Sequence, residues 1–130
     1  MPAPSAVPVR TRPAEPTHHL TGASFTSLAT PSSGSSDTAV WEVRLAPGHP
    51  AQPHQLTREE VFVVHEGHGT ASLDGVQHPL VPGSVLVVPA RTPFSISAEG
   101  DAELVATCVL PVGGQAVIEG QDAFTPPWAS

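Results

Sequence analysis

The sequence has no lysine, a single cysteine and few charged residues. Charged side chains make up 13% of the 130 residues, and the five basic ones are all arginines, scattered along the chain. A nucleic-acid-binding surface needs clustered lysine and arginine, and a formal net charge of -7 opposes contact with phosphates. The composition therefore argues against a nucleic-acid partner, and the acidity is more simply a solubility feature.

Long apolar runs are also missing. None approaches the roughly 20 residues that cross a bilayer, and the first residues lack the basic segment and apolar core of a signal peptide. With one cysteine, Cys108, no intrachain disulfide can form, and the apolar run 104–110 around it predicts a small buried hydrophobic side chain. We expect a cytoplasmic protein that makes no membrane contact.

Proline and glycine, in contrast, are abundant, with 16 and 11 residues respectively. They favour short segments joined by tight turns, and the length suits one domain with its own core. Residues 39–45 give the clearest strand, because apolar Trp41, Val43 and Leu45 alternate with polar residues. Strands are expected at 22–29, 39–45, 60–65, 70–74, 76–81, 84–88, 94–98, 103–110 and 115–118.

About nine short strands without crossover helices predict an all-β sandwich or small closed barrel. We expect the barrel to span residues 21–120. Residues 1–20 are rich in proline and predict an extended or disordered arm that reaches the barrel through the polar pair His18-His19. Residues 121–130 carry two aromatic side chains and predict a tail packed on the barrel.

The segment from Gly48 to Gly67 places metal-ligand residue types before and at the start of a strand. Gly48, His54, Glu60 and Gly67 occupy the first glycine, first histidine, glutamate and last glycine of the pattern G-x5-H-x-H-x3,4-E-x6-G. This spacing resembles the first motif of the cupin superfamily. The second histidine of that pattern falls on Leu56.

The second cupin motif, G-x5-P-x-G-x2-H-x3-N, is matched at Gly83 and Pro89. Its later glycine, histidine and asparagine fall on Arg91, Phe94 and Ala98. The resemblance, over about residues 38–112, implies a double-stranded β-helix, or jelly-roll, barrel. In members with an intact site, three histidines and one glutamate hold iron, manganese, nickel or zinc. Here the resemblance leaves only His54 and Glu60 as metal ligands.

Strand parity places the replaced positions inside the barrel. His54 and Leu56 share one strand face, and so do Phe94 and Ile96. Gln52 has the parity of His54 and offers a carbonyl oxygen, which is a poor ligand for a transition metal. The predicted cavity-lining residues are Gln52, His54, Leu56, Glu60, Phe62, Val64, Phe94 and Ile96.

Three functions fit this pattern. The first is a barrel that binds a small, partly apolar molecule, with His54 and Glu60 bonded to it or to each other, and with no metal or a weakly bound divalent one. The second is a cupin-type enzyme: a metal-dependent oxygenase, isomerase or lyase, or a metal-free isomerase or cyclase using His54 or Glu60 as acid or base. The third is a non-catalytic sensory or structural barrel.

The remaining histidines are weaker candidates. His65 and His68 flank a turn and could form only a surface site, while His49 and His78 stand beside prolines in expected turns exposed to solvent. The strand edges of such a barrel need covering, which together with the resemblance predicts a homodimer.

Overall fold

The computed structural model describes residues 8–130, which form an almost entirely β structure. A six-stranded antiparallel sheet has the order β1-β2-β3-β10-β5-β8, and a three-stranded sheet has the order β7-β6-β9. The larger sheet consists of β1 (His18–Leu20), β2 (Ala23–Ala29), β3 (Thr38–Leu45), β10 (Leu104–Pro111), β5 (Glu60–Glu66) and β8 (Val85–Val88). The smaller one consists of β7 (Val76–Leu80), β6 (His68–Leu73) and β9 (Phe94–Glu99).

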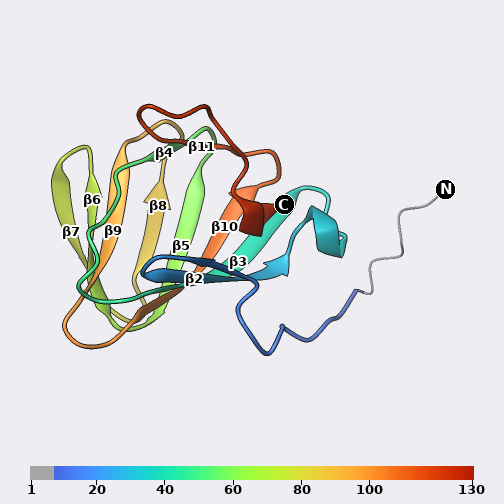
Figure 1. Cartoon of the computed structure of the whole chain (residues 1–130), viewed down its shortest axis with the longest axis horizontal. Coiled ribbons are helices and arrows are strands. Elements are labelled where there is room, and N and C mark those ends of the chain that lie inside the picture. The colour runs from blue at the N-terminus through green and yellow to red at the C-terminus, as the bar shows by residue number, and fades with distance from the viewer. Residues whose placement is uncertain (1–7) are drawn as a thin grey trace.

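A third, two-stranded ladder pairs β4 (Gln55–Leu56) with β11 (Ala116–Val117). Two 3-10 turns, η1 (Pro31–Ser33) and η2 (Pro127–Ala129), complete the regular structure of residues 8–130. Figure 1 shows the sheets curved into a barrel, with β4 and β11 at one end. The all-β jelly-roll prediction is confirmed.

Alternation along the central strands builds the core. On β5, Glu60, Phe62 and Val64 are buried, while the residues between them are only partly buried. Phe62 lies opposite Cys108 of β10, and Cys108 lies opposite Trp41 of β3. The inner faces of three adjacent strands therefore bury these side chains together, which is why the middle of the large sheet is apolar.

The three-stranded sheet is linked to the two-stranded ladder through a short backbone bridge between β9 and the residue before β4. The His54 amide donates to the Phe94 carbonyl over 3.0 Å, and the Phe94 amide donates to the His54 carbonyl over 2.8 Å. The Arg91 amide donates to the carbonyl of Leu56 over 2.7 Å. These bonds tie the two motif segments, far apart in the chain, to one end of the barrel.

Left-handed backbone marks the motif turns. Gly67 has φ of 82°, and a Cβ there would lie 2.1 Å from the Glu103 carbonyl oxygen, so only glycine fits. Arg91 stands where the second motif has glycine, and its φ of 57° keeps the left-handed conformation. The turn geometry is thus preserved although an unfavoured residue adopts it.

The N-terminal segment differs in part from the expected arm. Residues 1–7 lie outside the described residues, and residues 8–15 are exposed. Arg12 holds the segment on β3, because its guanidinium donates two hydrogen bonds of 3.0 Å to the Glu42 carboxylate. The His18-His19 pair is not a mere junction. It belongs to β1, which adds a further strand to the sheet by pairing with β2.

The C-terminal segment lies across β2 and β3 (Figure 1). The Ser27 hydroxyl donates to the Trp128 carbonyl over 2.8 Å, and Phe124 forms a backbone bridge with Ala116. The Trp128 indole stacks on Phe25 at 3.6 Å between ring centroids, with 2° between the planes. The division into arm (1–20), barrel (21–120) and tail (121–130) stays a prediction.

Several local expectations were wrong. Strand β6 begins at His68, two residues before the expected strand 70–74, because Gly67 alone separates β5 from β6. His78 lies in edge strand β7, within the expected strand 76–81 and not in the turn expected beside its proline; Pro79 is tolerated there because an edge strand can lack an amide, and the His78 side chain is exposed as expected. Strand β4 was not predicted, because two residues carry no periodic signal. No helix in residues 8–130 has the length and apolar character to cross a membrane.

Candidate functional site

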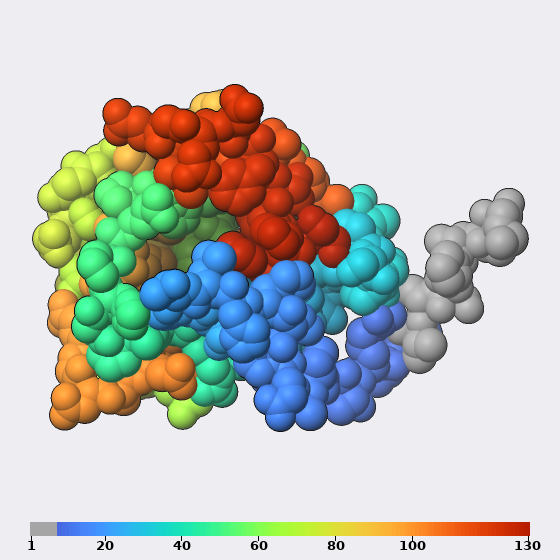
Figure 2. Space-filling model, in the orientation of Figure 1, coloured from blue at the N-terminus to red at the C-terminus, as the bar shows by residue number. Residues whose placement is uncertain are grey.

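The barrel encloses a cavity of about 310 Å³. Figure 2 shows its mouth as a hollow bordered by the β1–β2 turn near residue 20, the segment around residue 50 and the C-terminal segment. The structure brings the predicted lining residues together in the wall of this one cavity: Gln52, His54, Leu56, Glu60, Phe62, Val64, Phe94 and Ile96. Their functional roles stay predictions.

His54 sits at the edge of the cavity, partly buried against Phe94. The two ring centroids are 4.4 Å apart, and the backbone bridge between these residues holds both side chains in place. The Nδ1 atom of His54 lies 2.9 Å from the backbone carbonyl oxygen of Gln52. A carbonyl only accepts, so Nδ1 carries the proton of the neutral ring and Nε2 has a free lone pair.

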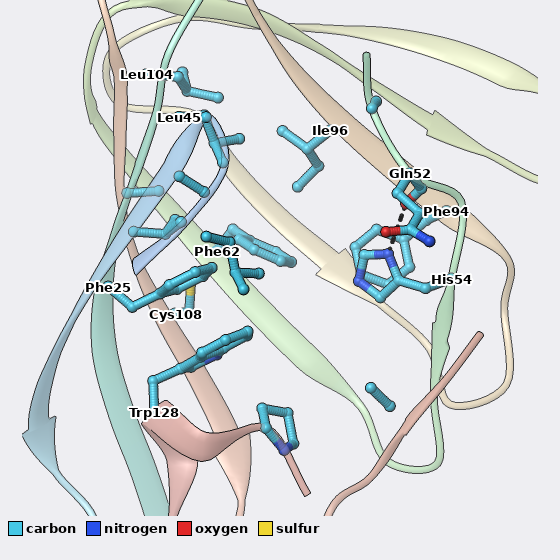
Figure 3. Close-up of a pocket in the computed structure, with 18 of the residues that line it drawn as sticks. Phe25, Leu45, Gln52, His54, Phe62, Phe94, Ile96, Leu104, Cys108 and Trp128 are labelled. Atoms are coloured by element: carbon cyan, nitrogen blue, oxygen red, sulfur yellow. Dashed lines mark hydrogen bonds between the residues drawn. The ribbon is translucent and has the colours of Figure 1, made fainter. Parts of the chain in front are cut away.

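The second ring nitrogen of His54 faces the cavity interior in Figure 3. Burial lowers the pKa of His54, and the Gln52 hydrogen bond offsets only part of this. At neutral pH His54 therefore presents a hydrogen-bond acceptor to the cavity. Gln52 contributes its backbone carbonyl to this bond, and the residue itself is exposed.

Glu60 is the first residue of β5, paired with Val88 of β8 and only 4% exposed. Burial raises its pKa to about 8, and no hydrogen bond or opposite charge contributes. Among residues 8–130, the only side-chain nitrogen or oxygen that is both inaccessible to solvent and without a hydrogen-bond partner is the Ser35 hydroxyl oxygen. The unpaired Glu60 oxygens must therefore retain access to open space, which is the cavity that Glu60 lines.

The two polar side chains of the wall are thus independent of each other. His54 is bonded to a backbone carbonyl and Glu60 to no other described group, so the suggested hydrogen bond between them is not formed. A neutral imidazole accepts and a protonated carboxyl donates. At pH 7 a pKa of about 8 leaves roughly nine-tenths of Glu60 protonated.

Most of the wall is apolar and aromatic. Leu56 and Phe94, at the two positions where the cupin pattern has histidines, are 4% and 2% exposed. The Phe62 and Phe94 rings meet edge to face with centroids 5.9 Å apart. Substituting histidine by these side chains turns the expected ligand set into an apolar surface.

Sequence reasoning missed another part of the wall. It includes Phe25 of β2, Trp41 of β3, Cys108 of β10 and, from the C-terminal segment, Phe124 and Trp128. The alternation that buried Trp41 could have indicated its position, but the two tail aromatics have no periodicity. Cys108 is buried as predicted, and this burial, followed by the nearby Glu60 carboxylate, raises the pKa of its thiol.

The side chains do not fit a tightly bound metal ion. A structural or catalytic transition-metal site uses three or four protein ligands. Residues 8–130 contain no cluster of three or more His, Cys, Asp or Glu side chains able to hold one. The surface pair does not supply such a site either: His65 is bonded to the Thr107 hydroxyl at 2.6 Å, and His65 and His68 are both exposed.

The fold and cavity define a small jelly-roll barrel with two polar side chains, His54 and Glu60, in the wall of an apolar cavity. The family model described as a cupin domain matches residues 41–110, and the chain belongs to this family. No curated protein is detectably similar in sequence.

Solved structures share the fold. Salicylate 1,2-dioxygenase from Pseudoaminobacter salicylatoxidans, with gentisate adducts, is 22% identical with a TM-score of 0.69, covering 82% of this chain and 31% of the other. KdgF from Halomonas sp. is 23% identical, with a TM-score of 0.64 and coverage of 75% and 86%. A cupin-superfamily sugar phosphate isomerase from Silicibacter pomeroyi is 27% identical, with a TM-score of 0.65 and coverage of 78% and 68%. The chain spans about a third of the dioxygenase's length.

Proposed function

We propose that this cupin barrel binds a small, partly apolar molecule in its cavity and holds no resident metal ion. The observation that carries the proposal is the Glu60 carboxyl, which lines an apolar cavity of about 310 Å³ and has no described protein partner. Binding pockets are typically apolar cavities of roughly 300–1,000 Å³ with a few placed polar groups. A buried polar group without a partner is costly, and a ligand can supply the missing one.

The wall suggests how such a ligand is oriented. Phe62, Phe94 and the other apolar side chains exclude water around its body, while Nε2 of His54 accepts from a donor and the Glu60 carboxyl donates to an acceptor. A ligand burying about 200 Å² of apolar surface gains roughly 5 kcal/mol before entropic costs. We therefore expect dissociation constants in the micromolar to millimolar range for simple compounds.

A cavity-filling variant tests the binding site. Ala106 is 2% exposed and lines the cavity, so Ala106→Leu adds three carbon atoms to its wall. Ala102 is exposed in the loop before β10, and Ala102→Leu makes the same chemical change outside the cavity. Calorimetry with hits from a small-molecule thermal-shift screen should show at least a tenfold weaker affinity for Ala106→Leu only. Equal affinity in both variants would place the binding site elsewhere.

Metal content tests the second half of the proposal. Protein purified without chelator should contain less than about 0.1 equivalent of iron, manganese, nickel or zinc per chain after dialysis, because two ligands hold a metal weakly. One equivalent that disappears in His54→Ala would instead support the metal-dependent enzyme, an oxygenase, isomerase or lyase.

A metal-independent acid–base catalyst is the second candidate. It is favoured by the opposite proton states of the two wall groups, since a protonated Glu60 and a neutral His54 in one cavity provide a donor and an acceptor at the same pH. Carbonyl compounds that bind should then exchange carbon-bound hydrogen in heavy water, and Glu60→Gln should abolish exchange while leaving binding. Unaltered exchange in that variant would contradict the role.

Assembly and location also stay proposals. β8 forms one edge of the large sheet, and its Val85 and Val87 side chains are 63% and 49% exposed. This apolar edge supports a homodimer, which sedimentation equilibrium at micromolar concentration would detect. A cytoplasmic location, expected from the sequence, is testable by cell fractionation.

A further inference from the structure

The wall of the cavity contains an acidic side chain but no arginine. Within residues 8–130, Glu60 is the only Asp, Glu or Arg residue in the wall, and none of the five arginines, which all fall in this range, lines it. Arg12 and Arg44 are occupied elsewhere, in ion pairs of 3.0 Å and 3.1 Å with Glu42. A carboxylate or phosphate that entered the cavity would therefore find no guanidinium or ammonium to pair with.

The aromatic groups of the wall also favour a positively charged ligand. Phe62, Phe94, Trp41 and the stacked pair of Phe25 and Trp128 all line the cavity. The faces of aromatic rings carry negative electrostatic potential and attract organic cations, most strongly where water is excluded. A net charge of -7 also raises the local concentration of cations around the molecule.

The Glu60 carboxyl supplies the specific partner. It is 4% exposed, it lines the cavity and no described residue pairs with it. The titratable groups that share the cavity with it are the Cys108 thiol from β10, His54 ahead of β4 and His49 at the mouth, while the paired strand β8 contributes the apolar Val88. None of these neighbours brings a permanent positive charge.

From this arrangement we propose that the cavity selects organic amines with an apolar or aromatic body over carboxylates and phosphates. The ammonium group pairs with the Glu60 carboxylate, and the body packs against Phe62 and Phe94. The inference rests on the proposed ligand-binding function and narrows its ligand class. A preference for amines distinguishes this barrel from the sugar phosphate isomerase that shares its fold, because a sugar phosphate is an anion.

Pairing with an ammonium changes the proton count of the protein. Free Glu60 is mostly protonated at pH 7, since burial raises its pKa to about 8. When the ammonium binds, the carboxyl loses its proton to the buffer, so the complex is an ammonium–carboxylate pair plus one released proton. Amine affinity should therefore rise about tenfold from pH 6 to pH 7 and level off above the Glu60 pKa.

Three probes of one shape test the inference on the full chain: benzylamine, benzyl alcohol and benzoate. Titration calorimetry at pH 7, in two buffers of different ionisation enthalpy, should show benzylamine binding at least tenfold tighter than the other two. It should also show release of roughly 0.9 proton per bound amine and none for the alcohol. Glu60→Gln should lose the amine preference and keep alcohol affinity within about threefold.

Glu59→Gln is the matched control, because it removes the same charge from the exposed neighbouring residue; it should bind all three probes as wild type does. Benzyl alcohol or benzoate binding as tightly as benzylamine would overturn the amine inference and leave the proposed function standing. Proton release is measured on wild-type protein, so absence of release on amine binding also overturns the inference even if Glu60→Gln fails to fold. No binding of any probe at millimolar concentration would overturn both proposals.

Discussion

Replacing Glu60 with glutamine should change how the stability of the barrel depends on pH. Burial raises the pKa of Glu60 from 4.5 to about 8, so between these values the folded chain retains a proton that the unfolded chain releases. The folded state then binds more protons than the unfolded state, and the free energy of unfolding falls as pH rises through this window. Above about pH 8 both states are ionised and the fall ends.

The size of the effect follows from the shift. Each pKa unit corresponds to about 1.4 kcal/mol, so a shift from 4.5 to about 8 corresponds to about 5 kcal/mol. Glutamine has no proton to lose, and the stability of Glu60→Gln relative to wild type should rise by that amount across the window. The buried amide carries its own cost of roughly 1–3 kcal/mol, which shifts the whole difference curve without changing its slope.

Other titratable groups contribute equally to the pH dependence of unfolding in wild type and in Glu60→Gln, so their contributions cancel in the difference between the two proteins. The pKa of His54 is lowered by burial from 6.5, so its contribution is present above pH 6.5 and is lost as pH falls below that value. This opposes the Glu60 effect in wild type but not in the difference between the two proteins.

Urea unfolding followed by tryptophan fluorescence, at half-unit steps from pH 5 to pH 9, measures the difference. Glu59→Gln serves as the control, because Glu59 is exposed and its replacement should give a flat difference curve. If the difference between Glu60→Gln and wild type stayed constant within about 1 kcal/mol from pH 5 to pH 8, the carboxyl would not be held protonated in the cavity and the reasoning would be refuted.

Three further changes give distinct outcomes. Leu56→His combined with Phe94→His restores the cupin ligand pattern and should bind about one equivalent of nickel or zinc per chain, whereas the wild-type chain should not. If metal analysis of the double variant found no bound metal, the assigned register of the two motifs would be contradicted. Arg12→Ala should destabilise the chain by about 1 kcal/mol at pH 7 in urea melts. That loss should disappear as pH falls below 4.5, because Arg12 lowers the pKa of Glu42 and the pair exists only while Glu42 is ionised; a loss that persisted at low pH would exclude the ion pair as its cause. Trp128→Ala removes a stacked ring and should cost roughly 2–4 kcal/mol and weaken ligand binding, with unchanged affinity arguing against the tail as part of the site.

The sequence by itself determined the features that depend on local chemistry. Strand faces follow from a period of two, so once the resemblance to the cupin motif places Glu60 inside the barrel, Phe62 and Val64 follow on the same face. Turn positions follow from glycine's access to positive φ, as at Gly67 and Gly83, with φ of 82° and 92°. The loss of a complete ligand set was also visible, since it needed only the residue types at two motif positions.

Only the tertiary structure decided the chemistry of the cavity. Which nitrogen of His54 carries the proton depends on the Gln52 carbonyl, and the pKa of Glu60 depends on having no described partner. The wall also needs Trp128, a residue about 100 positions from its stacking partner. Such contacts join segments with no shared periodicity, so no local pattern predicts them. The sequence placed Glu60 on the inner face of a strand, and the long-range packing around it left its carboxyl protonated and open to a ligand.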